Sequence, residues 1–411
     1  MASKLNTIEL FAGCGGMLDG FEKSGKYKTL AAVEWQKYAC DTLIRRLENK
    51  YNDHLSKDKV LCFDIQRTDE LIFGWKDDEK FGNNNGLDSL IKNNKIDVIA
   101  GGPPCQAYSV AGRIQDKDGM KFDYRNYLFE SYLKIVEHYM PKIIVFENVE
   151  GMLSAKPDGT NILGKIIDGF NNAGYEIVDD IKRHALLDLS EFGVPQKRKR
   201  VIIVGLNKNY YGDHAECQKI LYDFYTNILS SKKSDKKTVK DAIYDLPAIY
   251  PLKEELHRKM SHINLDDING HQSRYHSKRD IGIFKTLAED IESGANSYQS
   301  ADKLKELYTQ MTGKISNVHK YNVLNWDQPS NTIPAHLKKD GLRHIHPDPK
   351  QSRTITVREA ARLQTFDDDF EFTKGMGQNF EMIGNAVPPL FAKKLAESVY
   401  ELHCKYTKTE D

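Results

Sequence analysis

One cysteine lies in a Gly-Gly-Pro-Pro-Cys-Gln segment, residues 101–106, that directly follows the apolar run 96–100. A thiolate is strongly nucleophilic near neutral pH, and the two prolines restrict the backbone that carries this thiol. The carboxyl end of a strand is where open α/β sheets bind their ligands. Cys105 is therefore a candidate nucleophile. On this motif alone, a buried structural cysteine is an equally good interpretation.

Charged side chains follow two further apolar runs. Glu147 comes directly after residues 143–146, where a carboxylate beside a thiol suits general acid catalysis and burial would raise its pKa. Residues 196–200, Gln-Lys-Arg-Lys-Arg, lead into a strand expected at 201–205. By the period of two, three of these side chains share one face: Gln196, Arg198 and Arg200. Two guanidinium groups there could anchor phosphates or a carbonyl oxygen, although Glu147 could also cap a helix or pair with an arginine.

A third set of residues describes a nucleoside pocket. Residues 11–16, Phe-Ala-Gly-Cys-Gly-Gly, follow the first expected strand, and glycines let a backbone approach a ligand closely. A carboxylate at the end of the second expected strand could accept hydrogen bonds from both ribose hydroxyls. The indole next to it could stack on adenine. A second carboxylate, after the third expected strand, could accept a hydrogen bond from the adenine amine. This pattern lacks a pyrophosphate-binding motif, so it favours S-adenosylmethionine over NAD. The candidate residues are Phe11, Gly13, Cys14, Gly15, Gly16, Glu34, Trp35, Asp64 and Ile65.

Strands and amphipathic helices alternate in the first half of the chain. The expected strands are residues 7–11, 29–33, 60–63, 96–100, 142–146 and 201–205, and the clearest expected helices are 38–47 and 127–139. This alternation predicts an α/β fold with a parallel sheet covered on both faces. Residues 207–350 are polar and poor in periodicity, which predicts a smaller, irregular domain. Helical patterns return at 356–363 and 389–400.

Composition narrows the class of protein. The 411 residues include 59 basic and 59 acidic side chains and six cysteines without a C-x-x-C pair. We therefore expect reduced thiols, no metal site, and a soluble, cytoplasmic protein without a membrane segment or signal peptide. The zero net charge weighs mildly against nucleic acid, but basic residues cluster at 197–200, 232–240 and 271–279.

In order along the chain, these blocks resemble the DNA (cytosine-5) methyltransferases of prokaryotic restriction-modification systems. Small departures exist, such as Tyr108 where the family often has phenylalanine. The matching blocks are FAGCGG at 11–16, Glu34-Trp35, Asp64, GGPPCQAYS at 101–109, ENV at 147–149, QKRKR at 196–200, residues 353–364 and GNAVPP at 384–389.

The resemblance implies a Rossmann-like, doubly wound methyltransferase sheet with a target-recognition domain. The implied domains are residues 1–206, 207–350 and 351–411, the last returning to the catalytic domain. Pro104 and Asn385 would join the cofactor site.

The implied reaction moves a methyl group from S-adenosylmethionine to C5 of a cytosine flipped out of a short, specific duplex sequence. Cys105 would add to C6, Glu147 would hold N3, and Arg200, with Arg198, would bind the O2 side. The implied partners are double-stranded DNA and a cognate restriction endonuclease, and one active site requires only a monomer.

The DNA contacts are expected in two regions. Residues 107–123 resemble the family's mobile loop, and Ser109 and Arg113 are candidates to enter the vacated base stack. Within 207–350, Arg274, His276 and Arg279 are candidates for base or phosphate contacts.

Three alternatives remain. A branch of the family that methylates transfer RNA carries a Cys-Phe-Thr tripeptide, which this sequence lacks. A zinc deaminase would need a cysteine three residues after Cys105 and an upstream H-x-E, whereas the His-Ala-Glu here lies downstream, at 214–216. A DNA-binding regulator would not need Cys105, Glu147 and Arg200, although an added autoregulatory role stays open.

Overall fold

The structure is a computed structural model that describes residues 3–104, 128–156, 159, 161–253, 260–264, 266–315 and 320–407. Its contacts divide the chain into two compact units. Unit 1 comprises Met1–Phe192, Lys199–Ser234 and Val387–Asp411, and unit 2 comprises Gly193–Arg198 and Asp235–Ala386.

Unit 1 is built on an eight-stranded sheet in the order β3-β2-β1-β6-β7-β10-β8, with β9 paired to β10. Neighbours from β3 to β7 run parallel, and β10 is antiparallel to β7, β8 and β9. The bounds are β1 (Leu5–Leu10), β2 (Tyr27–Glu34), β3 (Val60–Cys62), β6 (Val98–Gly101), β7 (Ile143–Val149), β8 (Tyr175–Ile177), β9 (Leu186–Asp188) and β10 (Lys199–Asn207).

The α/β class expected from the sequence is confirmed, and the expected parallel arrangement holds from β3 to β7 but not for β10, which is antiparallel to its neighbours. The chain passes from β9 to β10 in ten residues, 189–198, without a crossover helix long enough to bring β10 in parallel. The antiparallel strands therefore sit at one side of a sheet whose other strands are parallel. The carboxyl ends of β1, β2, β3, β6 and β7 meet at one edge of that sheet.

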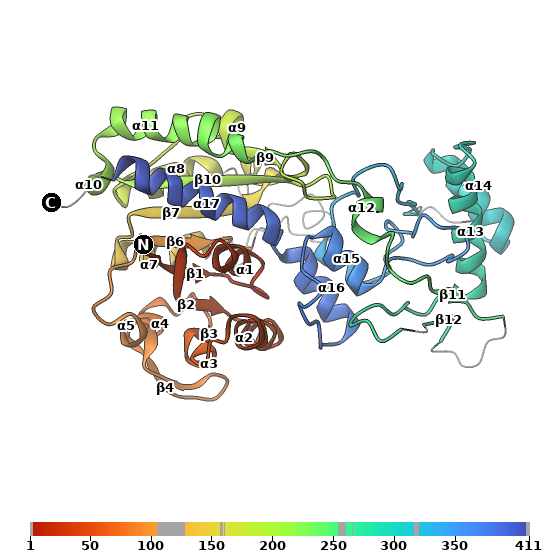
Figure 1. Ribbon diagram of the computed structural model, residues 1–411, viewed down its shortest axis with the longest axis horizontal. Coiled ribbons are helices and arrows are strands. Elements are labelled where there is room, and N and C mark those ends of the chain that lie inside the picture. The colour runs from red at the N-terminus through yellow and green to blue at the C-terminus, as the bar shows by residue number, and fades with distance from the viewer. Residues whose placement is uncertain are drawn as a thin grey trace. The chain divides into compact units, whose positions relative to one another are not determined.

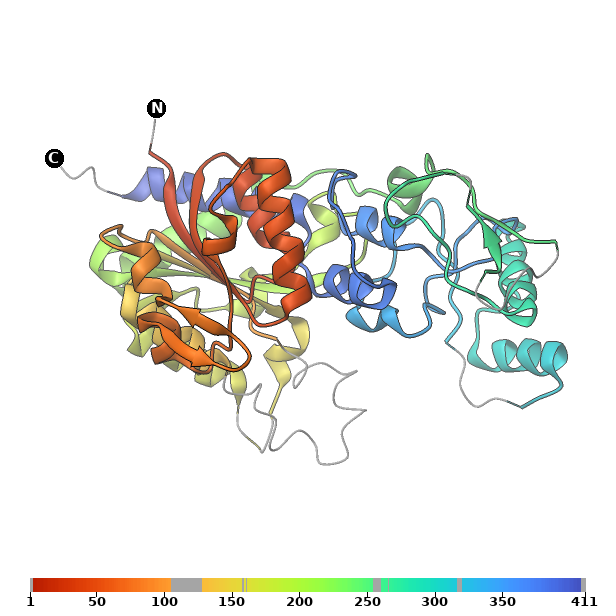
Figure 2. The same cartoon turned by 90° about the horizontal axis from the view of Figure 1, so that it is seen from below.

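Helices cover both faces of this sheet (Figures 1 and 2). Helices α1 and α17 pack so closely that a Cβ on Gly20 would lie 2.4 Å from that of Ala392. Helix α7 places Phe129 edge-on against Phe146 of β7 and Phe170 of α8. The helices of unit 1 and its small hairpin are α1 (Gly16–Lys23), α2 (Lys37–Tyr51), α3 (Ser56–Lys59), α4 (Thr68–Phe73), α5 (Gly86–Ile91), α7 (Leu128–Tyr139), α8 (Ile162–Asn172), α9 (Ile181–His184), α10 (Lys208–Tyr211), α11 (His214–Asp223), α17 (Pro389–Tyr406), β4 (Trp75–Asp78) and β5 (Gly82–Asn84).

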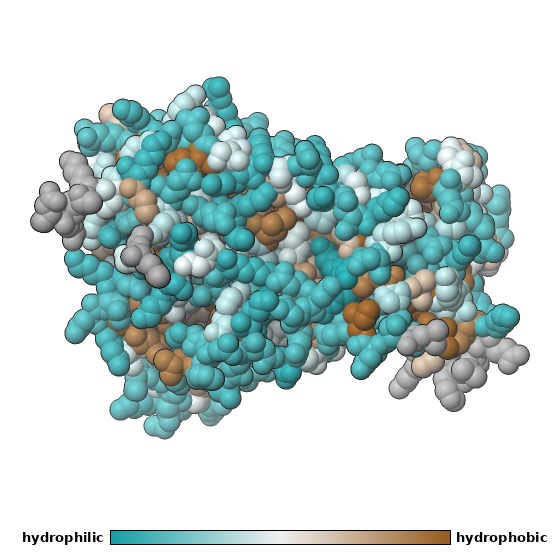
Figure 3. All heavy atoms as spheres, in the orientation of Figure 1, coloured by the Kyte–Doolittle hydropathy of each residue, from teal (hydrophilic) through white to brown (hydrophobic). Residues whose placement is uncertain are grey.

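The interior of unit 1 is apolar, and the surface is mostly hydrophilic on the face seen in Figure 3. The residues from Ile143 to Phe146 and from Val201 to Val204 are all buried. Such continuous apolar runs are typical of strands covered on both faces. Among the described residues, no helix is long and apolar enough to cross a membrane.

Unit 2 has fewer regular elements, but it is less irregular than the sequence predicted. Its helix α13 buries Ile283, Phe284 and Leu287 in an apolar cluster with Leu304 and Leu307 of α14. Charged residues between these positions obscured the helical period. The bounds are α12 (Val239–Ile243), β11 (Tyr250–Pro251), β12 (His262–Ile263), α13 (Lys278–Glu292), α14 (Ala301–Thr312), α15 (Val357–Leu363) and α16 (Met376–Asn385).

The unit boundaries differ from the expected domains 1–206, 207–350 and 351–411. Residues 207–234 stay with unit 1, where the Tyr225 hydroxyl donates to Ile202 O and accepts from Val204 N of β10. Residues 351–386 belong to unit 2, where the Arg358 guanidinium donates to the carbonyl of Asn269. At both boundaries, hydrogen bonds therefore join residues that are at least 21 positions apart in the sequence.

Candidate active site

The loop after β1 has an unusual backbone. Phe11, Gly13 and Gly15 have φ of 58°, 56° and 90°, in the left-handed region that side chains other than glycine rarely adopt. Ala12 N donates to Val33 O at 3.0 Å, which ties this loop to the end of β2. Non-glycine residues held at positive φ cluster at functional sites, so Phe11 marks this loop as a candidate ligand-binding segment.

Glu34, the last residue of β2, holds that loop through its carboxylate. Its Oε2 accepts from Gly13 N at 2.9 Å and its Oε1 from Gln36 N at 2.8 Å. Burial raises the pKa of Glu34, although the hydrogen bonds from the backbone oppose this effect. Each carboxylate oxygen can accept a second hydrogen bond, so Glu34 retains the capacity to accept two hydroxyls. A Cβ built on Gly13 would meet nothing within 4 Å, which leaves open space beside this carboxylate.

Two further cofactor candidates lie at the same edge of the sheet. Trp35 follows β2 and is 45% exposed, with the Lys80 ammonium 5.5 Å from the centre of its ring. Asp64 follows β3 and is half-buried, and its carboxylate accepts from Gln66 N at 3.0 Å. An exposed indole face and a carboxylate can bind the two ends of a purine.

The other residues expected at this pocket divide by exposure. Cys14, Gly15, Gly16 and Ile65 are buried, so they shape the loops from within. Burial raises the pKa of Cys14 well above its usual value, which keeps its thiol protonated. Pro104 is exposed at the end of the segment that follows β6.

Glu147 lies inside β7, one residue beyond the strand expected from the sequence. A Cβ built on Gly102 would lie 2.7 Å from Glu147 Oε2, so only glycine fits at that position without moving the carboxylate. The Glu147 side chain is 13% exposed. The Gly-Gly-Pro-Pro segment and this carboxylate are therefore direct neighbours.

Arg200 pairs with the same carboxylate. In the antiparallel ladder Val149 lies opposite Arg200 and Glu147 opposite Ile202, so Glu147 and Arg200 are diagonal neighbours on one face. Arg200 Nε lies 2.9 Å from Glu147 Oε1. The alternative that Glu147 pairs with an arginine is confirmed, and the guanidinium lies beside a carboxylate at the end of β7.

The shared face predicted for Gln196, Arg198 and Arg200 is wrong, because β10 begins only at Lys199. Arg198 belongs to unit 2, is 1% exposed and donates to the carbonyls of Ile333, Gly384 and Ala386 at 3.0–3.1 Å. Gln196 is buried in the same unit and donates to Leu363 O at 2.9 Å. These contacts give both residues a structural role in place of the substrate contact expected of Arg198.

The three DNA-contact candidates of unit 2 also differ in their exposure and contacts. His276 is 5% exposed and accepts from Thr354 N, and burial lowers its pKa to about 3. Arg274 donates to Leu337 O and stacks on the Phe380 ring at 4.8 Å. Both side chains make contacts inside unit 2, in place of the base or phosphate contacts expected of them. Arg279 is exposed on α13 beside Asp280 and remains a candidate.

The remaining expected site residues lie outside the described residues or in unit 2. Cys105, Ser109, Arg113 and the loop 107–123 lie outside the described residues. Asn385 is exposed at the end of α16, in unit 2. Among the described residues, no group of three or more side chains could hold a metal ion.

The structure adds two contacts that the sequence did not predict. Lys80 reaches the Trp35 ring from the hairpin formed by β4 and β5, and no motif surrounds it. The approach of Gly102 to Glu147 carried a weak signal, because paired glycines often mark close contacts.

An α/β sheet with acidic side chains and a glycine-rich loop at its carboxyl edge is typical of nucleoside-binding enzymes. The model of the C-5 cytosine-specific DNA methylase family matches residues 5–401. The chain therefore belongs to the C-5 cytosine-specific DNA methylase family.

Individual relatives agree with this assignment. The chain is 31% identical to the type II methyltransferase M.Bpa9945I of Bacillus paralicheniformis, over 96% of this chain and 98% of the relative. It is 28% identical to the type II methyltransferase M.AgeI of Thalassovita gelatinovora, over 96% of this chain and 99% of the relative. A solved structure from E. coli shares the fold with a TM-score of 0.59 at 24% identity. It is described as a DNA modification methyltransferase encoded within a prophage, and the match covers 97% of this chain and 99% of that chain.

Proposed function

We propose that the protein transfers a methyl group from S-adenosylmethionine to C5 of a cytosine flipped out of a short, specific duplex sequence. The reaction passes through a covalent bond between Cys105 and C6. The observation that carries this proposal is the Glu147 carboxylate, which lies against Gly102 of the Gly-Gly-Pro-Pro-Cys segment and beside the Arg200 guanidinium.

Cytosine C5 is a weak nucleophile, and addition of a thiolate to C6 moves electron density onto C5. In the proposed sequence the Cys105 sulfur bonds to C6, C5 takes the methyl group, the C5 proton leaves, and the sulfur–C6 bond breaks. The electron pair left by the C5 proton re-forms the C5–C6 double bond, and Cys105 departs from C6 as a thiolate. A duplex base is inaccessible to such a thiol, so the cytosine must first leave the stack.

Glu147 has two oxygens with different partners. Arg200 holds Oε1 at 2.9 Å, and Oε2 faces Gly102. We assign Oε2 to the cytosine N3, where a shared proton offsets the charge that develops as C6 is attacked. Arg200 contributes positive charge near the O2 side of the ring. Arg198 is not part of this proposed set, because its donors serve backbone carbonyls.

The side chains at the carboxyl edge of the sheet are compatible with S-adenosylmethionine, which would supply an electrophilic methyl group when bound. Glu34 would hold the ribose hydroxyls, the Trp35 ring the adenine face, and Asp64 the adenine amine. The open space beside Gly13 is compatible with a close approach of the ligand to the backbone. Asn385 and Pro104 stay assigned to this site as part of the proposal.

The biological setting is a type II restriction-modification system, by analogy with the relatives named as type II methyltransferases. In this setting the methyl group protects host DNA from a cognate endonuclease. The enzyme works as a monomer on double-stranded DNA, with Arg279 and the loop 107–123 among the DNA contacts.

The decisive experiment measures transfer of labelled methyl groups to unmethylated genomic DNA, followed by bisulfite sequencing. Wild type should deposit 5-methylcytosine in one short motif, Cys105→Ala should transfer none, and Glu147→Gln should lose about 100-fold in rate or more. DNA with 5-fluorocytosine at that motif should trap wild type covalently, because fluorine cannot leave as the C5 proton does.

Three outcomes would contradict the proposal. Label in RNA but not in DNA would favour the transfer-RNA branch. Full activity of Cys105→Ala would remove the covalent mechanism. The third outcome uses a lysate that cuts the unmethylated plasmid at the recognised motif. If this lysate also cuts plasmid that the enzyme has methylated, the protective role is contradicted.

A further inference from the structure

Two thiols flank the turn that carries Glu34 and Trp35. Cys40 lies in α2, just after this turn, and is buried. Cys62 is the last residue of β3, pairs in register with Glu34 and is half-buried. Residues 22 positions apart in sequence thus meet at the base of the proposed cofactor pocket.

Both thiols donate to the backbone of that turn. Cys40 Sγ lies 3.3 Å from Glu34 O, and Cys62 Sγ lies 3.7 Å from Trp35 O. Cys62 also packs against the apolar cluster that contains Cys40. The two thiols are therefore neighbours in one cluster and hold two consecutive carbonyl groups of one turn.

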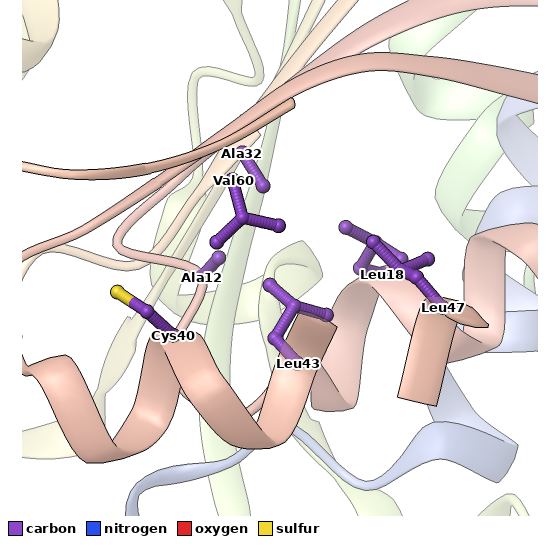
Figure 4. Close-up of a cluster of buried hydrophobic side chains, with 7 residues drawn as sticks. All are labelled: Ala12, Leu18, Ala32, Cys40, Leu43, Leu47 and Val60. Carbon is purple, nitrogen blue, oxygen red and sulfur yellow. The ribbon is translucent and has the colours of Figure 1, made fainter. Parts of the chain in front are cut away.

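The two thiols differ in their surroundings. Cys40 packs in an apolar cluster with Ala12, Leu43 and Val60 (Figure 4), and Cys62 lies at the margin of that cluster. The neighbouring Cys40 thiol lowers the pKa of Cys62, and the Lys37 ammonium adds to this effect. The neighbouring Cys62 thiol, together with burial, raises the pKa of Cys40. A more acidic, more accessible thiol beside a buried one is the arrangement of a sensor cysteine and its resolving partner.

We propose that Cys40 and Cys62 are a peroxide-sensitive thiol pair that closes to a disulfide and thereby weakens binding of S-adenosylmethionine. The effect on affinity rests on the proposed function, in which Glu34 and Trp35 hold the cofactor. The modification site itself rests on the placement of both thiols at consecutive carbonyl groups of one turn and in one apolar cluster.

The oxidation balances with hydrogen peroxide as the oxidant. The Cys62 thiolate attacks one peroxide oxygen, the O–O bond breaks, and a sulfenic acid and hydroxide form. The Cys40 thiol then attacks the Cys62 sulfur, its proton leaves, and the sulfenic oxygen departs as water. Two thiols and one peroxide thus give one disulfide and two waters, and a thiol reductant reverses the step.

A disulfide would disturb the pocket through short connections. The S–S bond is about 2.05 Å long, shorter than any non-bonded contact between sulfur atoms, so the two thiols must move together to form it. Cys40 N donates to Gln36 O at 3.0 Å, and Gln36 N donates to Glu34 Oε1 at 2.8 Å. Movement of Cys40 therefore reaches the Glu34 carboxylate through one turn of α2. Both S–H donors to the Glu34–Trp35 carbonyls are lost at the same time.

The test uses the full chain carrying Cys105→Ala, so that oxidation of the proposed nucleophile cannot contribute. Calorimetry measures the Kd for S-adenosylmethionine before hydrogen peroxide, after it, and after dithiothreitol, and peptide mapping without reductant locates disulfides. We expect a Cys40–Cys62 disulfide and an increase in Kd of about tenfold or more, the loss expected when one charge-assisted hydrogen bond is displaced. Dithiothreitol should restore the original Kd.

Matched variants in the same background separate this pair from other thiols. Cys62→Ala, and Cys62→Ser if the first folds poorly, should bind the cofactor without sensitivity to peroxide. Cys404→Ser removes an exposed cysteine of α17 and should remain sensitive.

The proposal is overturned if no Cys40–Cys62 disulfide is found, or if Kd is unchanged in a sample that contains it. Failure of the reduced protein to bind S-adenosylmethionine would instead count against the proposed function, and it would also remove the predicted effect on affinity. Mapping of the disulfide decides the modification site in either case.

Discussion

In unit 1 the backbone carbonyls of β7 and β10 accept from neighbouring strands, whereas in unit 2 many carbonyls accept from buried side chains. Arg358, fully buried, donates to the carbonyls of Asn269, Asp367 and Phe370. His271 likewise bonds to Pro247 O at 2.8 Å. Buried backbone groups need partners, and a unit with short strands obtains them from arginine and histidine.

This difference explains which polar side chains remain available to bind a ligand or to act in catalysis. In unit 1 the ladder satisfies the backbone, so polar groups at the strand ends, such as Glu34 and Glu147, can face a ligand. In unit 2 the charges are used internally, as in the buried pair of Arg353 and Glu359. Burial alone would raise the pKa of Glu359, but the adjacent guanidinium lowers it far below the usual range.

The largest expected effect is an opposite response of the two units to acid. Burial lowers the pKa of His262 and His344 to about 4 and that of His276 and His346 to about 3. These groups are neutral when folded and protonate on unfolding below pH ~6.5, so unit 2 loses stability as pH falls from ~6.5 toward 4. The loss is on the order of 1–2 kcal/mol per histidine at pH 5.

Unit 1 should gain stability as the pH falls, in the range where its buried carboxyl groups dominate the response. Burial raises the pKa of Glu9 and Glu34, so their cost at neutral pH disappears as pH falls, although His403, with a pKa lowered by burial, offsets part of this gain. Hydrogen exchange with mass spectrometry, corrected for intrinsic rates, follows peptides of each unit. Equal loss of protection in both units between pH 7 and 5 would contradict the comparison.

The second effect concerns the buried ion pair of unit 2. Arg353→Ala leaves Glu359 buried without its guanidinium, which should cost about 3–5 kcal/mol of unfolding free energy in urea. Replacing both partners, as Arg353→Met with Glu359→Leu, should recover part of that loss, because neither buried charge remains. Lys350→Ala, at an exposed position, is the control. A loss below about 1 kcal/mol for Arg353→Ala would show that the pair is dispensable.

The third effect tests the strand ends of unit 1. Gly102→Ala places a Cβ 2.7 Å from Glu147 Oε2 and should displace the carboxylate. We expect kcat for methyl transfer to fall about 10- to 100-fold, since small misplacements of catalytic groups have effects of this size. Gly377→Ala is the control, because its nearest neighbour would be 3.9 Å away. Wild-type kcat for Gly102→Ala would argue against the role assigned to Glu147.

The smallest effect concerns the cation above Trp35. Lys80→Ala removes the ammonium from one face of this ring, and the Kd for S-adenosylmethionine should rise about two- to fivefold, the range expected for one exposed cation–π contact. Lys76→Ala, exposed on the same hairpin, should leave Kd unchanged. If Lys80→Ala and Lys76→Ala raised the Kd equally, the effect would come from the loss of positive charge and not from the contact with Trp35.

Much of unit 1 could be predicted from the sequence because its elements are locally encoded. The strand expected at 29–33 is Tyr27–Glu34, and the helix expected at 38–47 is Lys37–Tyr51. The helix expected at 356–363 is α15, with Thr356 as its N-cap. Unit 2 resisted prediction because α13 mixes charged and apolar residues and because β11 and β12, with two residues each, are too short to show an alternating pattern.

The sequence by itself determined the types and order of the chemical groups, because the ends of parallel strands meet at one edge whatever the details of packing. Only the tertiary structure decided which of two similar arginines faces the site. Arg198 and Arg200 are two residues apart, which in a continuous strand would put them on one face. Because β10 begins at Lys199, Arg200 follows the ladder to Glu147, whereas Arg198 is buried among carbonyls of unit 2. The position of a strand's first residue depends on long-range pairing, and local periodicity does not contain it.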